Sequence, residues 1–163
     1  MDIFNKKITI GIRAYNVEHY IEQCLDSVYN QTIREDIQIV IVEDCSTDNT
    51  LNIINNWIDA HQSVSVQLYN NSINKGAGVG LMLLQEYIQN TEYVIMLDGD
   101  DFYLKNDCLE YMYNFIHKHD FDFVKFFGEI DLIHTGYLIK YNLYKQIKFN
   151  PFRFGEDGYG IQL

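Results

Sequence analysis

The chain reads Tyr93-Val94-Ile95-Met96-Leu97-Asp98-Gly99-Asp100-Asp101 at the point where an apolar run passes directly into an acidic turn. A continuous apolar run of this length is typical of a sheet strand that is buried on both faces. Asp98 and Asp100 are two residues apart, so in extended backbone both carboxylates project to the same side. Hard oxygen ligands at that spacing suit Mg²⁺ or Mn²⁺, and Gly99 between them leaves room for a close approach. This stretch therefore predicts a buried strand, followed either by a metal site formed by Asp98 and Asp100 or by an acidic surface loop without a ligand.

The same pattern of strand followed by helix recurs along the chain before this stretch. Apolar runs at residues 8–12 and 37–42 predict two more buried strands, and alternating apolar side chains at residues 64–68 predict a third. Apolar side chains at helical spacing predict the helices between them: Val17, Ile21, Leu25 and Val28; Leu51, Ile54, Trp57 and Ile58; Leu81, Leu84 and Ile88. Ser46 or Thr47 is expected to cap the second helix, and a glycine-rich turn over residues 74–80 to lead into the third. Strands that alternate with helices predict an α/β fold with a mainly parallel sheet covered on both faces.

Polar side chains follow three of the predicted strands, at Tyr15-Asn16, at Glu43-Asp44 and at Asp98 to Asp101. In an open parallel sheet, ligands bind beyond the carboxyl ends of the strands. Three separate strands would then direct acids and amides into one crevice. The sequence therefore predicts a ligand site at this edge of the sheet.

Composition limits the class of protein. The 163 residues, 47% of them hydrophobic, are enough for one domain over residues 1–163. The formal net charge of −11 counts against nucleic acid and anionic membranes as general partners. No secretion signal or apolar run of membrane-spanning length is apparent, and three cysteines without CxxC spacing suit a reducing compartment, so a soluble cytoplasmic protein is expected.

Five stretches together carry a family resemblance: Ile10-Gly11-Ile12-Arg13-Ala14-Tyr15-Asn16, Tyr20-Ile21, Leu25-Asp26-Ser27-Val28-Tyr29-Asn30-Gln31-Thr32, Ile39-Val40-Ile41-Val42-Glu43-Asp44-Cys45-Ser46-Thr47-Asp48-Asn49-Thr50 and Leu97-Asp98-Gly99-Asp100-Asp101. With them the chain resembles a family-two glycosyltransferase of the GT-A fold over most of its length. The resemblance implies inverting transfer of a sugar from a nucleoside-diphosphate sugar, above all a UDP-sugar, to an acceptor hydroxyl.

The resemblance also implies roles for particular residues. A Mn²⁺ or Mg²⁺ ion would bridge Asp100 and the diphosphate, with Asp98 supporting the metal or the ribose. The residues expected to bind the nucleotide sugar are Ala14, Tyr15, Asn16, Glu43, Asp44, Lys75, Gly76, Asp98 and Gly99. Glu156-Asp157 resembles the pair that supplies the general base of an inverting reaction, so Asp157 is the expected base and Glu156 its neighbour. An acidic chain end without a catalytic role is the alternative.

The chain departs from the family pattern at two places. Arg13-Ala14 stands where a proline and a threonine are common, and Leu81-Met82 stands where an Arg-Asn pair helps to hold the nucleotide. Lys75, beside glycines whose amides could face phosphate, is a candidate replacement, with a tight turn into a helix as the alternative reading of the glycines. Residues 1–101 then form the nucleotide-sugar half and residues 102–163 a reduced acceptor subdomain. Such a subdomain either binds the acceptor through few contacts or is completed by a second protein or a partner subunit, as in a homo-oligomer. The other alternative is that the chain is a piece of a longer protein.

The acceptor stays open at this point between a glycan, a lipid and a modified base in DNA. Lys140, Lys145, Lys148 and Arg153 alternate with aromatic residues, which would suit DNA as the acceptor. The alternative is that Leu138, Leu143 and Ile147 pack one more helix onto the sheet while the lysines face water. A nucleotidyltransferase is disfavoured because its glycine-rich, basic loop is missing after the first strand. A non-catalytic module that binds a nucleotide sugar remains the runner-up.

Overall fold

A computed structural model describes residues 6–125, 137–149 and 151 of the chain. Its elements follow one another in this order: β1 (Lys6–Ala14), α1 (Ile21–Tyr29), the 3-10 helix η1 (Arg34–Asp36), β2 (Ile37–Glu43), α2 (Thr50–Ala60), β3 (Ser65–Asn70), α3 (Ala77–Tyr87), β4 (Thr91–Asp98), α4 (Cys108–His119), β5 (Phe123–Lys125), β6 (Tyr137–Lys140) and α5 (Tyr141–Tyr144). The alternation of strands and helices up to β4 confirms the sequence-based prediction.

The six strands form one sheet in the order β3-β2-β1-β4-β6-β5. The four strands from β3 to β4 run parallel, whereas β6 pairs antiparallel with both β4 and β5. In the register of the central strands, Ala14 lies opposite Glu43, and Arg13 lies opposite Asp98. The carboxyl ends of β1, β2 and β4 therefore meet at one edge of the sheet.

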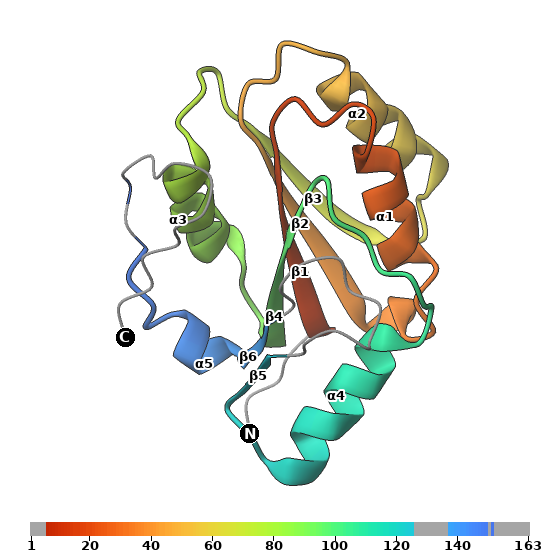
Figure 1. Ribbon diagram of the computed structural model, residues 1–163, viewed down its shortest axis with the longest axis vertical. Coiled ribbons are helices and arrows are strands. Elements are labelled where there is room, and N and C mark those ends of the chain that lie inside the picture. The colour runs from red at the N-terminus through yellow and green to blue at the C-terminus, as the bar shows by residue number, and fades with distance from the viewer. Residues whose placement is uncertain (1–5, 126–136, 150, 152–163) are drawn as a thin grey trace.

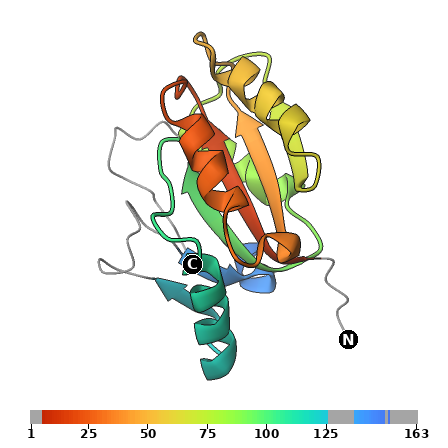
Figure 2. The same ribbon diagram turned by 90° about the vertical axis from the view of Figure 1, so that its right-hand side faces the viewer.

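Helices cover both faces of this sheet (Figures 1 and 2). Helices α1 and α2 lie on one face, shown toward the viewer in Figure 2, and α3 lies on the other. Side chains alternate between the two faces of a strand, so each face of the sheet has its own core. On one face, Ile8, Ile10 and Ile12 of β1 join a core with residues of α1, α2 and α4. The opposite core joins Val40, Val42 and Val94 to α3 and α5 residues. The mainly parallel α/β fold with two covered faces is confirmed.

Two local predictions and one alternative interpretation were wrong. Helix α3 begins at Ala77, so the glycine-rich segment is a turn only as far as Gly76, and the glycines after it are helical. Helix α2 has Asn49 at its N-cap, and Asp48, rather than Ser46 or Thr47, accepts the N–H of Thr50, at 3.0 Å. Residues 137–147 do not form one helix, because Leu138 lies in β6 and Leu143 in the short helix α5.

The part of the chain that the structure describes contains no helix that is long and apolar enough to cross a membrane. Trp57 is buried in the core, as its place on an apolar helix face predicted, and its Nε1 donates to Asp26 Oδ1 at 2.7 Å. His61 stacks on the Trp57 ring with a centroid distance of 4.2 Å. These contacts join α1 to α2 on the face away from α3.

Candidate functional site

A pocket of about 230 Å³ opens at the sheet edge where the carboxyl ends of β1, β2 and β4 meet the first turns of α3. Its lining consists of Arg13, Ala14, Tyr15, Val17, Val42, Asp44, Ala77, Gly80, Asp98, Gly99 and Asp100. Six residues that the sequence singled out are thus brought together: Ala14, Tyr15, Asp44, Asp98, Gly99 and Asp100. The predicted crevice exists, and parallel strands create it because their carboxyl ends lie on the same side.

The acidic turn after β4 is held against the end of β1. The Gly99 N–H donates to the Arg13 carbonyl at 2.9 Å, and the Asp101 N–H donates to the Asp98 carbonyl at 2.9 Å. A Cβ on residue 99 would stand 2.9 Å from that same Arg13 oxygen, closer than real Cβ contacts come. A glycine is therefore required between the two aspartates, for close packing of the turn against β1.

Asp98 and Asp100 differ in their surroundings. The Arg13 guanidinium holds Asp98: Nε donates to Asp98 Oδ1 at 3.0 Å, and Nη2 donates to the same oxygen. Asp100 is exposed, and no hydrogen bond or ion pair joins its side chain to another described residue. Of the two predicted metal ligands, Asp100 is thus the carboxylate open to a ligand from outside the chain.

Asp44 lies at the end of β2 and is tied to the start of α3. Its Oδ1 accepts hydrogen bonds from Lys75 N–H at 2.9 Å and from Asn71 Nδ2 at 2.8 Å, and its Oδ2 accepts one from Gly76 N–H at 2.7 Å. The Lys75 ammonium turns back to Asn71 Oδ1, at 3.0 Å. Lys75 and Gly76 therefore adjoin the pocket through their backbone, and neither lines it.

Glu43 and Asn16 shape the loops around the pocket. Glu43 is fully buried, and its carboxylate accepts the N–H groups of Cys45 and Ser46 at 3.1 and 2.7 Å, which fixes the turn after β2. Asn16 Oδ1 accepts the Thr47 N–H at 2.8 Å, so it joins the loop after β1 to that turn. Neither residue lines the pocket. Tyr15, 45% exposed, lines the pocket and is accessible to a ligand.

The sequence model of Glycosyl transferase family 2 matches residues 9–160, nearly the whole chain. The chain belongs to glycosyl transferase family 2. The poly(ribitol-phosphate) beta-glucosyltransferase of Bacillus spizizenii is 36% identical over 117 residues, which cover 71% of this chain and 18% of that protein. An uncharacterized glycosyltransferase of Haemophilus influenzae is 36% identical over 109 residues, which cover 67% of this chain and 42% of the relative. The chain thus spans less than half the length of these relatives.

Solved structures agree with this membership. Staphylococcus aureus TarS 1–349 in complex with UDP-GlcNAc has a TM-score of 0.65 and 27% identity, over 72% of this chain and 33% of that one. The mannosyltransferase PcManGT of Pyrobaculum calidifontis, in complex with GDP-Man and Mn²⁺, has a TM-score of 0.73 and 20% identity, over 86% of this chain and 46% of that one. These likenesses confirm the GT-A fold that the resemblance implied.

The acidic edge of this family-2 chain affects a buried thiol beneath it. Cys24 Sγ lies 3.6 Å from the Asp98 carbonyl. Burial raises the pKa of the Cys24 thiol far above its ordinary value, and the negative charges of Asp101, Asp100 and Asp98 add to that shift. The thiol therefore stays protonated and acts as a small core side chain.

A divalent cation at the end of β4 would have few protein ligands. No cluster of three or more His, Cys, Asp or Glu side chains suited to a metal occurs within residues 6–125, 137–149 and 151. Mg²⁺ in nucleotide-dependent enzymes is usually held by one or two carboxylates together with substrate phosphates and water. Asp100, with Asp98 beside it, fits that limited role.

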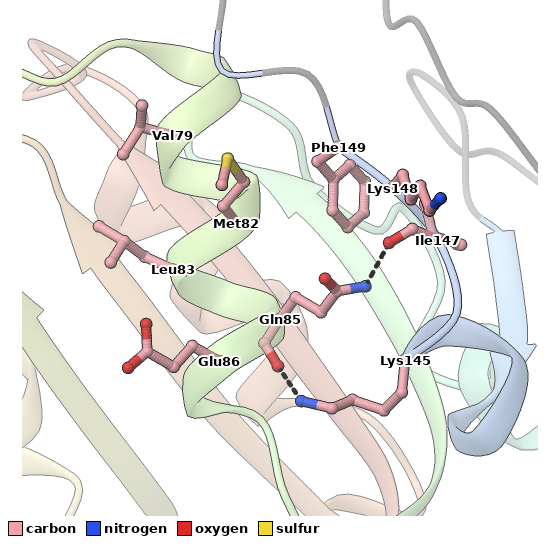
Figure 3. A pocket seen from close by; sticks show the side chains of 9 residues that line it. All are labelled: Val79, Met82, Leu83, Gln85, Glu86, Lys145, Ile147, Lys148 and Phe149. Carbon is pink, nitrogen blue, oxygen red and sulfur yellow. Dashed lines mark hydrogen bonds between the residues drawn. The ribbon is translucent and has the colours of Figure 1, made fainter.

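The basic stretch that suggested DNA lies near a different pocket, of about 580 Å³, between α3 and residues 145–149 (Figure 3). The Lys145 ammonium donates to the Gln85 carbonyl, and Gln85 Nε2 donates to Ile147 O at 2.9 Å. Lys140 is paired with Asp120 and Asp122, each at 3.0 Å. Two of the four candidate basic residues are thus engaged within the chain, Lys148 lines this second pocket, and Arg153 lies outside the described residues.

The predicted catalytic pair, Glu156 and Asp157, also lies outside the described residues and stays a prediction. Arg13 is the site residue that sequence reasoning missed. Its partner Asp98 is 85 positions away, so no local pattern signals the contact. The available signal was the departure from the family pattern itself, an arginine where a proline is common.

Proposed function

We propose that this chain binds a nucleoside-diphosphate sugar and transfers the sugar, with inversion and in a metal-dependent reaction, to an acceptor hydroxyl. The observation that carries the proposal is the pocket in which Asp44, Asp98 and Asp100 converge from the ends of two strands, in a chain of glycosyl transferase family 2. A binding module without turnover would need the same pocket, so catalysis has to be tested separately from binding.

We assign the nucleoside to the side of the pocket formed by β1 and β2. Ala14 and Tyr15 line the pocket there, and the exposed ring of Tyr15 offers a face for a base. Asp44 lines it beside the start of α3, while Asn16 and Glu43 act through the loops that they hold. The 27% identity to TarS, solved with UDP-GlcNAc, supports a uridine nucleotide as the donor.

We assign the diphosphate to the side formed by β4 and the start of α3. Asp98 and Asp100 would lie near the phosphates there, with Asp100 as the principal ligand of Mn²⁺ or Mg²⁺. The cation would offset the charge that develops on the diphosphate leaving group. Lys75 and Gly76 support this side by fixing the first turn of α3 through their bonds to Asp44.

The acceptor proton needs a general base, and Asp157 with Glu156 as its neighbour remains the proposed source. The Bacillus spizizenii relative is named for poly(ribitol-phosphate), and two Pasteurella multocida relatives, each 36% identical over 63% of this chain and 10% of their own length, are named chondroitin synthase and hyaluronan synthase. These names support a carbohydrate acceptor. DNA is less favoured, because Lys140 and Lys145 are held by partners in this chain.

A panel of nucleotide sugars tests this function without knowledge of the acceptor. We expect slow hydrolysis of one donor class, a UDP-sugar, that requires Mn²⁺ or Mg²⁺ and stops with EDTA. Asp157→Asn should keep nucleotide binding and lose turnover. If the chain binds donors but hydrolyses none in any metal, the transferase proposal is overturned in favour of a binding module.

A further inference from the structure

The lining of the proposed nucleotide pocket has an uneven charge balance. Three carboxylates line it, those of Asp44, Asp98 and Asp100, and Arg13 is the one basic residue among the lining residues that the structure describes. A nucleoside diphosphate is itself an anion, so an uncompensated cluster of this kind would repel it. The binding of a nucleoside diphosphate therefore depends on which positive or N–H group offsets the charge of each carboxylate.

Each of the three carboxylates is in a different situation. Asp44 accepts three N–H donors, two of them backbone groups at the start of α3. Asp98 is paired with the Arg13 guanidinium, whose side chain is only 16% exposed. Asp100 has no hydrogen bond or ion pair with another described residue. The protein compensates two of the charges itself, and one is left for a cation from solution.

The Arg13 side chain joins three elements at this point. It leaves the end of β1, bonds Asp98 at the end of β4, and donates from Nη1 to the Ala77 carbonyl in the first turn of α3, at 3.3 Å. Gly80 of α3 lies beside it, where a Cβ would make an ordinary contact of 3.4 Å with Arg13 Cδ. Lys75, the replacement suggested by the sequence, is exposed and directed to Asn71. The cation of the pocket is therefore Arg13.

We propose that Arg13 is the positioning residue of the nucleotide site: it neutralises Asp98 and fixes it against α3, so that Asp100 alone recruits the divalent cation and the pocket accepts a diphosphate. The inference rests on the proposed function. It divides the acidic turn into a carboxylate held by the protein, Asp98, and a carboxylate that holds metal, Asp100.

Opposite effects on two ligands follow from this role. Removing the guanidinium charge makes the surroundings of Asp98 and Asp100 more negative, which strengthens the binding of Mn²⁺ alone by roughly three- to tenfold. The same change increases the repulsion of a diphosphate and releases Asp98, so UDP at saturating Mn²⁺ binds about tenfold more weakly. If Arg13 had a purely structural role, its removal would instead weaken the binding of both Mn²⁺ and UDP.

The test uses the full 163-residue chain with Arg13→Gln, Arg13→Lys and the control Arg34→Gln. Arg34 pairs with Glu35 at the other end of β2, away from the pocket. Mn²⁺ binding is titrated by electron paramagnetic resonance, with the pocket site identified as the one that Asp100→Asn removes, and UDP binding is measured by calorimetry at saturating Mn²⁺. Arg13→Lys keeps the charge but not the planar fork, so it should retain the Mn²⁺ affinity and still weaken UDP.

The outcomes separate the inference from the proposed function. If Arg13→Gln binds Mn²⁺ more tightly and UDP more weakly than the unchanged chain, the inference is supported. Unchanged affinities for both ligands, or weaker binding of both, overturn it. If Arg13→Gln does not fold, the UDP affinity of Arg13→Lys decides instead. An affinity equal to that of the unchanged chain overturns the inference. If the unchanged chain binds no nucleoside diphosphate, the proposed function falls, while the Mn²⁺ titration of Arg13→Gln still decides the charge balance.

Discussion

Asp44 Oδ2 accepts the backbone N–H of Gly76 at 2.7 Å, and this bond joins the end of β2 to the residue before α3. The helix N-terminus presents N–H groups without intrahelical acceptors, and a carboxylate there is also favoured by the helix dipole. Asp44 thus stabilises the start of α3 at the wall of the pocket. The stability of this junction and the shape of the nucleotide site are linked.

Asp44→Asn should destabilise the chain by about 1–3 kcal/mol, because one amide group cannot accept all the N–H bonds that the carboxylate accepts. The same change should weaken nucleotide binding, since the start of α3 loses its anchor. Urea unfolding monitored by circular dichroism measures the first effect. Asp59→Asn, an exposed change on α2, is the matched control. Equal midpoints for the two variants would contradict the anchoring role.

Gly76→Ala should be destabilising by about 1–3 kcal/mol, because residue 76 has φ 86° and ψ 162°, a conformation that side-chain-bearing residues rarely adopt. Gly78→Ala should instead raise the free energy of unfolding by about 0.5–1 kcal/mol, since residue 78 is inside α3, where alanine is favoured over glycine. Thermal unfolding of both variants checks the pair. If both lose stability equally, α3 does not begin where the structure places it.

Gly99→Ala should destabilise the turn that carries Asp98 and Asp100. Its Cβ would meet the Arg13 carbonyl at 2.9 Å, a backbone atom that cannot move without shifting β1, and overpacking of this kind costs about 1–3 kcal/mol. Gly80→Ala is the comparison, because its Cβ would make an ordinary contact of 3.4 Å with Arg13 Cδ. We expect a clear loss of melting temperature for the first variant and none for the second. The reverse order would show that the turn is not packed against β1.

The Cys24 thiol should make stability fall in alkaline solution. Burial and then the neighbouring aspartates raise its pKa in the folded state, whereas in the unfolded chain it ionises near pH 8.5. The stabilisation is therefore complete below about pH 8.5 and decreases as the pH rises above that value. Unfolding free energies measured from about pH 7.5 to 10 should decline less steeply in Cys24→Ala than in the unchanged chain. Identical slopes would mean that the thiol ionises equally in both states.

Much of the fold could be predicted from the sequence because its signals are local. Apolar runs as in β1, β2 and β4 identify buried parallel strands, and their order along the chain implies helices on both faces. Short elements carry weaker signals. The apolar residues from Leu138 to Ile147 are compatible with a helix as well as with a strand, and pairing with β4 decides that residues 137–140 form a strand. The glycines of α3 favoured a longer turn, but burial of Gly80 and Leu84 against the sheet favours helix.

The convergence of Ala14, Tyr15, Asp44 and the acidic turn at one edge of the sheet was predictable, whereas the contacts of their side chains were less so. That Asp98 and Asp100 end a strand follows from residues 93–101 alone. Glu43 was expected at the nucleotide, yet its carboxylate binds the N–H groups of its own turn, a contact that depends on backbone angles such as the φ of 61° at Cys45. The pairing of Arg13 with Asp98 depends on two strands lying side by side, which no stretch of sequence displays.

Calorimetric titration of UDP into the chain, with Mn²⁺ and with EDTA, tests most directly whether the acidic end of β4 is a metal-dependent nucleotide site. We predict binding that requires the metal and becomes at least about tenfold weaker in Asp100→Asn, with the unfolding midpoint unchanged and Asp59→Asn behaving as the unaltered chain. If no nucleoside diphosphate binds in the presence of Mn²⁺, or if Asp100→Asn binds UDP with undiminished affinity, the assignment of this pocket to the donor nucleotide is contradicted.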